Sequence, residues 1–116
     1  MRKDKLSVQS MDFAAAIIHL VKDLKAKKES IISNQIGRSG TSIGANIREA
    51  QYAHSKADFI SKLQIALKES NETDYWLELL YWTEYISEDT YKKLATDCTG
   101  IRAMLIASIN TAKGES

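Results

Sequence analysis

The sequence of 116 residues contains no proline and a single cysteine, Cys98. Because proline interrupts helices, its absence favours helices joined by short connections. One cysteine cannot form an internal disulfide, and Cys98 falls on an apolar helical stripe, which predicts a buried, unreactive thiol. The sequence therefore predicts an all-α chain and gives its cysteine no redox role.

Long hydrophobic runs are also missing, because no apolar segment approaches the roughly 20 residues that cross a bilayer. The basic residues Arg2, Lys3 and Lys5 are not followed by the apolar segment and cleavage site of a secretory signal. With 44% hydrophobic and 27% charged residues, the composition is typical of a globular protein in water. We expect one domain over residues 1–116, a cytoplasmic location and no membrane association.

An excess of charge of one sign is absent, since 16 Lys and Arg residues oppose 15 Asp and Glu residues. This balance is not typical of a nucleic-acid-binding domain, which is usually strongly basic. The charges are unevenly distributed, however. Residues 1–28 carry a local balance of +4 and residues 55–86 one of −3, so the beginning of the chain is basic and its middle acidic.

Apolar residues recur at helical spacing in four segments. We predict helices over residues 10–28, 30–54, 56–86 and 88–112. Ser87 is the predicted N-cap of the fourth helix, and Glu88 and Asp89 favour the positive end of its dipole. Amphipathic helices with short connections predict an antiparallel up-down-up-down four-helix bundle, about 30 to 40 Å long at a rise of about 1.5 Å per residue.

Three glycines, Gly37, Gly40 and Gly44, lie at helical spacing within the second predicted helix. Each costs roughly 1 kcal/mol relative to alanine, so we interpret them as a packing groove that lets another helix approach closely. A phosphate-binding loop is the alternative. No Gly-Lys-Ser/Thr motif follows, however, and Ile36 and Ile43 keep a helical period through the glycines.

Polar residues also occur where the helices should face one another. Ser70 and Thr73 interrupt the apolar stripe of the third predicted helix, and Asn46 lies nearby in a bundle. Because unpaired buried polar groups are costly, we expect these three side chains to form hydrogen bonds across the core.

Aromatic residues are few, but six of the nine crowd into the end of the third predicted helix and the start of the fourth. They point around nearly the whole helix, whereas a bundle helix needs one apolar face. Self-association is the preferred explanation, with an exposed aromatic rim or a base-stacking platform as alternatives. The acidic neighbours Asp74, Glu78 and Glu84 oppose base stacking. The predicted oligomer interface comprises Tyr75, Trp76, Tyr81, Trp82 and Tyr85.

The second and third predicted helices carry a pattern that resembles a known family. It reads Gln35-Ile-Gly-Arg38-Ser39, Ser42-Ile43, Asn46-Ile47 and Glu49, then Phe59, Leu63, Ile65-Ala66, Ser70 and Glu72. It is similar to that of the four-helix-bundle proteins named after the intervening sequences of 23S ribosomal RNA, often labelled S23 ribosomal protein. The likeness extends from about Asp12 to Ala112, with departures at Gly44, Arg48 and Ala50.

The resemblance implies more about architecture than about activity. Members are similar to the accessory proteins of diversity-generating retroelements, which form ring-shaped homopentamers and associate with a reverse transcriptase and nucleic acid. It therefore implies a homopentamer, with RNA or DNA as a ligand or with a reverse transcriptase or another protein as a partner. The ribosomal label reflects where some of the genes lie and does not imply a place in the ribosome.

No arrangement of residues predicts catalysis, a metal site or a cofactor. His19 and His54 have no companion at metal-ligand spacing. The carboxylates of the third predicted helix lack the Glu-x-x-His repeats of a di-iron bundle. Ser39, Ser42 and Cys98 have no identifiable histidine base in their own segments. We expect a protein that is not an enzyme.

The polar residues that match or flank the family pattern allow two interpretations. In the structural one, they join the second and third helices, with a carboxylate pairing with Arg38. The residues concerned are Ser42, Asn46, Glu49, Ser70 and Glu72. In the functional one, Arg38 and Arg48 face a phosphate backbone. That surface would be extended by Lys22, Lys25, Lys27 and Lys28, although a solvated lysine face is the usual interpretation of such a run.

The leading hypothesis is a non-enzymatic, homo-oligomeric accessory factor that binds RNA or DNA through its assembled basic surface. Five copies of a weakly basic segment would form a basic ring, so that many weak contacts act together. The alternative is an adaptor that docks a partner protein, such as a reverse transcriptase, without touching nucleic acid.

Overall fold

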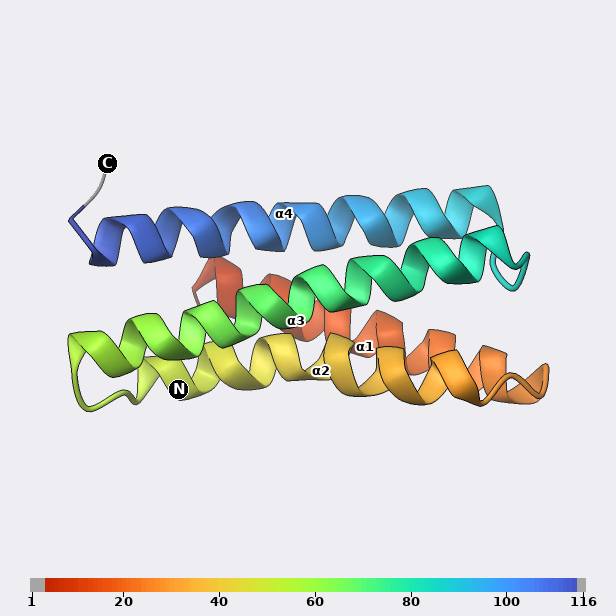
Figure 1. Cartoon of the computed structure of the whole chain (residues 1–116), viewed down its shortest axis with the longest axis horizontal. Coiled ribbons are helices and arrows are strands. Elements are labelled where there is room, and N and C mark those ends of the chain that lie inside the picture. Colours follow the sequence, from red (N-terminus) through yellow and green to blue (C-terminus); the bar gives the residue numbers. More distant parts are fainter. Residues whose placement is uncertain (1–3, 115–116) are drawn as a thin grey trace.

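A computed structural model describes residues 4–114, which form four long helices (Figure 1). These are α1 (Lys5–Ala26), α2 (Ile31–Gln51), α3 (Lys56–Trp82) and α4 (Glu88–Ala112). Helices that follow one another along the chain pack together, and α4 closes against α1. The predicted antiparallel four-helix bundle is confirmed, and its Cα atoms extend over 44 × 24 × 21 Å.

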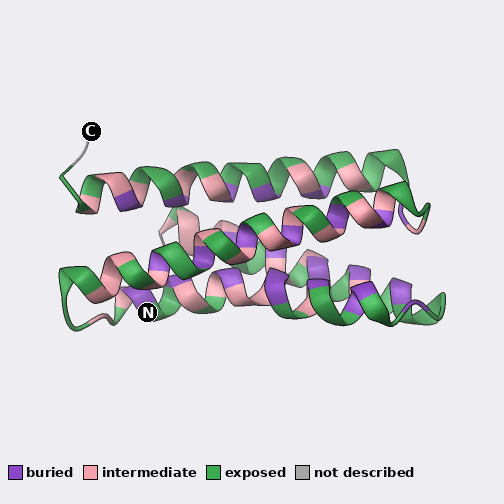
Figure 2. Ribbon diagram, viewed as in Figure 1, coloured by how far each residue is buried: buried purple, intermediate pink, exposed green. Residues whose placement is uncertain are grey.

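The core runs along the inner face of all four helices, where buried residues recur every three or four positions (Figure 2). In α2 the buried stripe includes Ile36, Ile43 and Ile47, and in α3 it includes Leu77 and Leu80. This spacing is that of helices packed side by side in a bundle. Within residues 4–114, no helix is long and apolar enough to span a membrane.

The glycines of α2 form the predicted packing groove. A Cβ atom at Gly40 would lie only 2.9 Å from Cγ1 and Cγ2 of the buried Ile17 in α1. A Cβ atom at Gly37 would lie 3.3 Å from Cγ2 of Val21, and a Cβ atom at Gly44 would lie 3.3 Å from Oγ of Ser10; both neighbours belong to α1. The glycines therefore let α1 approach α2, as the sequence predicts.

The starts of α1 and α2 differ from the predicted ones. α1 begins at Lys5 rather than at residue 10, because the Asp4 side chain accepts a hydrogen bond from Ser7 N at 2.8 Å and caps the helix. α2 begins at Ile31, and its cap is the buried Glu29 carboxylate, while the Ser30 side chain makes no capping hydrogen bond. The carboxylate accepts three backbone hydrogen bonds, from Ile31, Ile32 and Ser33, at 3.0, 2.9 and 2.7 Å.

Three helix ends also come earlier than predicted. α3 ends at Trp82 instead of residue 86, because Glu84 adopts a left-handed conformation with φ of 66°. The amide of Tyr85 then donates to the carbonyl of Leu80 at 2.9 Å, which closes the last turn. Lys28, with φ of 65°, ends α1 in the same way. α2 ends at Gln51 rather than at residue 54.

Candidate functional site

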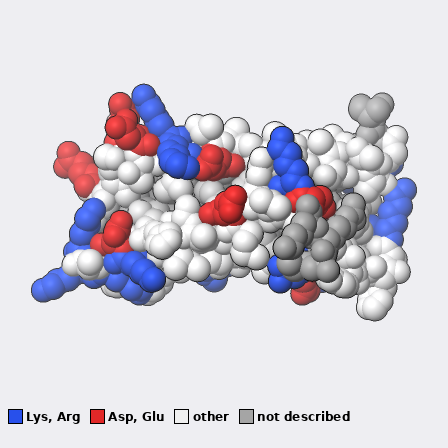
Figure 3. All heavy atoms as spheres, turned by 180° about the vertical axis from the view of Figure 1, so that it is seen from behind, with Lys and Arg blue, Asp and Glu red and all other residues white. Residues whose placement is uncertain are grey.

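Four exposed lysines gather at the end of the bundle where α1 turns into α2. We call them the basic end; they are Lys22, Lys25, Lys27 and Lys28. In Figure 3, which views the molecule from behind, blue side chains gather in the lower part of this end, at the left. Lys25 Nζ donates to Asn34 Oδ1 at 2.8 Å, and Lys27 Nζ to the Tyr85 carbonyl at 3.0 Å.

The basic end keeps its positive charge. The acceptors of the hydrogen bonds from Lys25 and Lys27, the Asn34 amide and the Tyr85 carbonyl, are neutral. Across residues 4–114, none of the four lysines has a carboxylate as an ion-pair partner. The four ammonium groups are therefore available to an anionic ligand.

Arg38 is placed differently, because it joins α2 to α3. Its Nη1 lies 3.0 Å from Oε2 of Glu69, and its Nη2 donates to Glu72. This geometry agrees with the structural interpretation of the family-pattern residues. Sequence reasoning missed Glu69, although its spacing of three residues from Glu72 puts both carboxylates on one side of α3. We name these three side chains the α2–α3 clasp.

The α2–α3 clasp shifts the pKa values of Arg38 and Glu72. The hydrogen bond to Glu72, and then the negative charge of Glu69, raise the pKa of Arg38 above its ordinary value. Burial alone would raise the pKa of Glu72, but the hydrogen bond from Arg38 and further favourable interactions outweigh it and hold that pKa below 4.5. Both partners of the ion pair are thus charged at neutral pH.

The expected hydrogen bonds across the core are found for one of three side chains. The hydroxyls of Thr73 and Ser39 form a hydrogen bond of 2.8 Å across the fully buried space between α3 and α2, and the Thr73 hydroxyl also lies 2.8 Å from the Glu69 carbonyl, which accepts its proton. The expectation is wrong for Ser70 and Asn46, which donate to carbonyls of their own helices at 2.7 and 2.9 Å. Short polar side chains in a helix commonly bond to the preceding turn in this way.

Ser42 behaves like Ser70, because its hydroxyl donates to the carbonyl of Arg38 within α2 at 2.6 Å. Ser70 nevertheless contributes to helix packing through its backbone. The Cys98 thiol of α4 lies 3.4 Å from the Ser70 carbonyl of α3. Among the family-pattern residues, Glu72 therefore makes a side-chain contact to another helix, whereas Ser42, Asn46 and Ser70 bond within their own.

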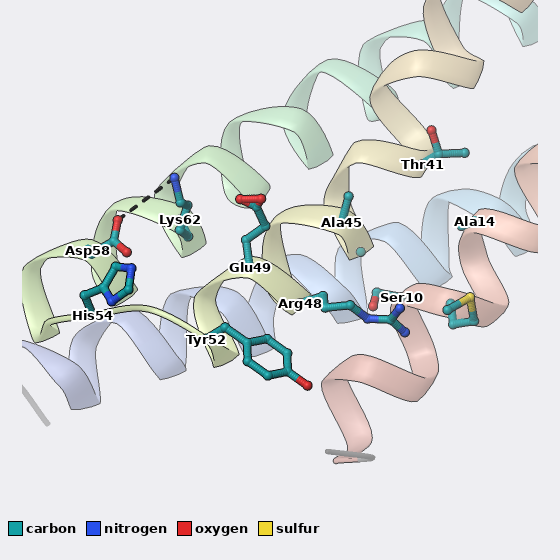
Figure 4. A pocket seen from close by; sticks show the side chains of 12 residues that line it. Ser10, Ala14, Thr41, Ala45, Arg48, Glu49, Tyr52, His54, Asp58 and Lys62 are labelled. Carbon is teal, nitrogen blue, oxygen red and sulfur yellow. Dashed lines mark ion pairs between the residues drawn. The ribbon is translucent and has the colours of Figure 1, made fainter. Parts of the chain in front are cut away.

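A groove of about 940 Å³ crosses the opposite half of the bundle (Figure 4). The small residues Gly44 and Ala45 of α2 leave space between side chains of α1 and of α3. Arg48 lines this groove and reaches toward Ser10 of α1. Asn34, which accepts the hydrogen bond from Lys25 of the basic end, also belongs to α2. At a rise of about 1.5 Å per residue, Arg48 lies roughly 20 Å along the helix from Asn34. The structure thus separates Arg48 from the lysines that were predicted to share its surface.

The groove carries charges of both signs. Glu49 from α2 lines it, and Asp58 and Lys62 of α3 form an ion pair at 4.0 Å on its wall. Tyr52 and His54 complete the end near the α2–α3 turn (Figure 4). In the described part of the chain, no group of three or more His, Cys, Asp or Glu residues could hold a metal ion. The mixed rim suits a polypeptide better than a phosphate backbone.

The aromatic residues divide into exposed and packed ones. Tyr75 and Trp82 are 58% and 78% exposed, and with Leu79 they form what we call the aromatic patch on the outside of α3. A hollow of about 300 Å³ lies there, lined by these three residues and Glu78. The other residues of the predicted interface are half-buried and pack against the core: Trp76, Tyr81 and Tyr85.

The half-buried aromatic side chains differ in how completely the monomer provides their ring contacts and hydrogen bonds. Tyr81 stacks on Tyr91 of α4 with ring centroids 4.9 Å apart. Trp76 meets Tyr75 edge to face at 5.0 Å, and its buried Nε1 has no hydrogen-bond partner within residues 4–114. The surplus of aromatic side chains that the sequence shows is therefore reduced in the structure to Tyr75 and Trp82.

Cys98 lies in the core between α3 and α4 and is fully buried. Burial, with smaller contributions from Asp74 and Asp97, raises the pKa of its thiol to about 12. The thiolate needed for nucleophilic or redox chemistry is therefore rare at neutral pH. His19 and His54 are exposed and lie on different parts of the bundle.

Comparisons with known proteins agree with the fold. The model of a family described as 23S rRNA-intervening sequence protein matches residues 2–107. A crystal structure from Bacteroides thetaiotaomicron, of a protein with unknown function from the S23 ribosomal protein family, is 55% identical and has a TM-score of 0.88. The match covers 90% of this chain and 97% of that chain. The comparison with curated proteins gives no significant match.

Proposed function

Because the chain belongs to the 23S rRNA-intervening sequence protein family, we propose that it is a non-enzymatic accessory factor that assembles into a homopentamer and binds RNA. The observation that carries the proposal is the basic end, with four exposed lysines and no carboxylate paired with any of them in the described chain. Such a surface contacts phosphates without reading sequence.

Assembly strengthens a surface that is weak in one copy. The net charge of the chain is only +1, so a single basic end has a small long-range attraction for nucleic acid. Cyclic symmetry places equivalent ends on one circle, and several of them contact one RNA together. Exposed Tyr75 and Trp82 support assembly, because large aromatic side chains are enriched in interface cores.

Fluorescence anisotropy with a labelled, structured RNA tests this function. We expect binding to weaken steeply as salt rises, because each phosphate contact releases a counterion. The Lys25→Gln/Lys28→Gln variant should bind more weakly, with a log–log salt slope smaller by about 2 for each engaged chain. The matched control is Lys56→Gln/Lys113→Gln, which removes the same charge at the opposite end of the bundle and should bind like wild type.

Two results would contradict the function. One is binding that is absent at low salt or does not respond to salt. The other is equal weakening by both double variants, which would mean that net charge, and not the basic end, governs the interaction.

A protein-docking adaptor is the second candidate, and the groove over α2 favours it. The groove combines small residues, Gly44 and Ala45, with a rim that carries both Arg48 and Glu49, a mixture that matches a polypeptide. Co-purification of a stoichiometric partner protein, such as a reverse transcriptase, without nucleic acid would support the adaptor over the RNA-binding factor.

A further inference from the structure

We propose that the outer face of α1 docks the aromatic patch of a second copy, so that identical subunits join head to tail. This inference rests on the homo-oligomer of the proposed function and assigns the two surfaces that build it. One surface was predicted from the aromatic residues. The other surface, on α1, is recognised only from the structure, which shows which apolar side chains of this helix are exposed.

The outer face of α1 is apolar although the monomer leaves it uncovered. Val8, Met11 and Ile18 are all exposed, and Ile18 is 48% exposed. With Ala15 they are spaced by three, four and three residues, so they form one stripe along the helix. Phe13, by contrast, belongs to the buried stripe of the same helix. We call the stripe the α1 apolar face; a solvated bundle helix would normally carry polar residues there.

The aromatic patch offers a matching surface on α3. Trp82 is 78% exposed beside the hollow that it forms with Tyr75 and Leu79. A flat stripe of aliphatic side chains and a patch with a large aromatic ring and a hollow are the kind of surfaces that pack together in an interface core. Met11 also lines the groove, so the α1 apolar face continues toward α2.

Exposed charges of opposite sign lie beside the two surfaces, basic ones near the α1 apolar face, which the acidic Asp12 also flanks, and acidic ones near the aromatic patch. Lys22 lies one turn beyond Ile18, and Arg48 reaches toward α1 from the side of the groove (Figure 4). Of the basic end, Lys22 alone joins this contact, so Lys25, Lys27 and Lys28 remain available to RNA. Glu78 lines the aromatic hollow, and Glu84 follows two residues after Trp82.

An ion-pair partner among residues 4–114 is lacking for each of four charged side chains: Lys22, Arg48, Glu78 and Glu84. A second copy therefore supplies both the apolar area and the opposite charges that each surface lacks. This complementarity is the reason to assign the occupant as the same chain.

The fold makes the contact head to tail. Within the described residues α1 does not pack against α3, because the two helices lie diagonally across the bundle. In Figure 1, α3 lies in front and α1 behind, and Figure 3, from behind, shows broad uncharged areas between charged side chains. The outer faces of diagonal helices point to different sides, so the contact joins two unlike surfaces. Such a contact repeats around a ring or along a filament.

Two single variants each remove one surface. Ile18→Glu places a negative charge on the α1 apolar face, and Trp82→Ser removes the main side chain of the aromatic patch. Matched controls are Ile106→Glu on α4, where Ile106 is 44% exposed, and Ile31→Ser on α2, where Ile31 is 78% exposed. We expect each test variant to raise the dissociation constant by about 30-fold or more, and the controls to assemble like wild type.

Mixing the two test variants then distinguishes a head-to-tail contact from a symmetric one. Each variant keeps one intact surface, so a 1:1 mixture should form a species of two chains and stop there. Sedimentation velocity of each variant alone and of the mixture measures this result. Circular dichroism of each variant checks that the exposed substitutions preserve the bundle.

The inference is overturned if wild type assembles but either test variant assembles equally well, or if two monomeric variants fail to combine. A monomeric wild type would instead remove the homo-oligomer of the proposed function, and this inference with it. The mass of the wild-type protein therefore separates the two failures.

Discussion

Gly40 is the residue where the absence of a side chain matters most for packing. The Ile17 side chain of α1 occupies the space that a Cβ atom would need, and Ile17 is completely buried. Gly100 in α4 is the opposite case, because nothing lies within 4 Å of the position of its Cβ atom. The same residue type thus has a packing role in one helix and none in the other.

This contrast predicts opposite effects of the same substitution. Gly40→Ala should lower the free energy of unfolding by about 1 to 3 kcal/mol, because overpacking outweighs the gain in helix propensity. Gly100→Ala should raise it by roughly 0.5 to 1 kcal/mol through propensity alone. Urea denaturation of both variants measures the two changes. A stabilised Gly40→Ala variant would contradict the close approach of α1 and α2.

At the scale of elements, the start of α2 depends on the buried carboxylate of Glu29. Its three hydrogen bonds satisfy backbone amides that would otherwise have no partner at the helix start. Glu29→Ala should lower the free energy of unfolding by about 2 kcal/mol. Glu49→Ala, an exposed glutamate of the same helix, is the control and should change it by less than about 0.5 kcal/mol. Equal effects in thermal or urea unfolding would contradict the cap.

The α2–α3 clasp predicts a pH dependence at the scale of a helix pair. The pKa of Glu72 is lower in the folded state than its ordinary value of 4.5. Its contribution to stability is therefore fully present above about pH 4.5 and is lost as the pH falls through the folded-state pKa. The difference in unfolding free energy between wild type and Glu72→Gln should shrink as the pH falls below 4.5.

Urea titrations at several pH values measure this difference. Glu49→Gln is the control, because Glu49 belongs to neither the clasp nor the proposed subunit contact and has no ion-pair partner in the described chain; its difference from wild type should not show this loss. A Glu72→Gln difference that does not change with pH would mean that the ion pair with Arg38 adds nothing to stability.

Elements also show what sequence alone could predict. The four helices follow from periodicity, which is a local property repeated over many residues. The ends of α1 and α3 were missed because Lys28 and Glu84 adopt a left-handed conformation that usually needs glycine. The start of α1 was missed because Asp4 stands before residues with weak apolar periodicity.

For the candidate site, the predictable part was the part that is contiguous in sequence. The lysines of the basic end lie within seven positions of one another. The partners Ser39 and Thr73, and the pair Arg38 and Glu69, depend on how two helices are rotated about their axes, which a single sequence does not specify. The groove was missed for the same reason, because α1, α2 and α3 all contribute to it.

At the scale of the whole molecule, the proposed function depends on assembly. One chain has a net charge of +1, an uncovered apolar face on α1 and an exposed aromatic patch on α3. A closed ring would cover both apolar surfaces and gather the basic ends of all copies around one axis. Assembly would thus cover the exposed apolar residues and bring the basic ends together, which is how we propose that a nearly neutral chain binds RNA.

The most direct test is light scattering of the purified protein, coupled to its absorbance ratio at 260 and 280 nm. Each chain has a mass of 13.0 kDa. We predict a mass near five chains, with an absorbance ratio raised by nucleic acid that co-purifies at low salt. A species with the mass of one chain and no nucleic acid would contradict both the proposed assembly and the RNA binding that depends on it.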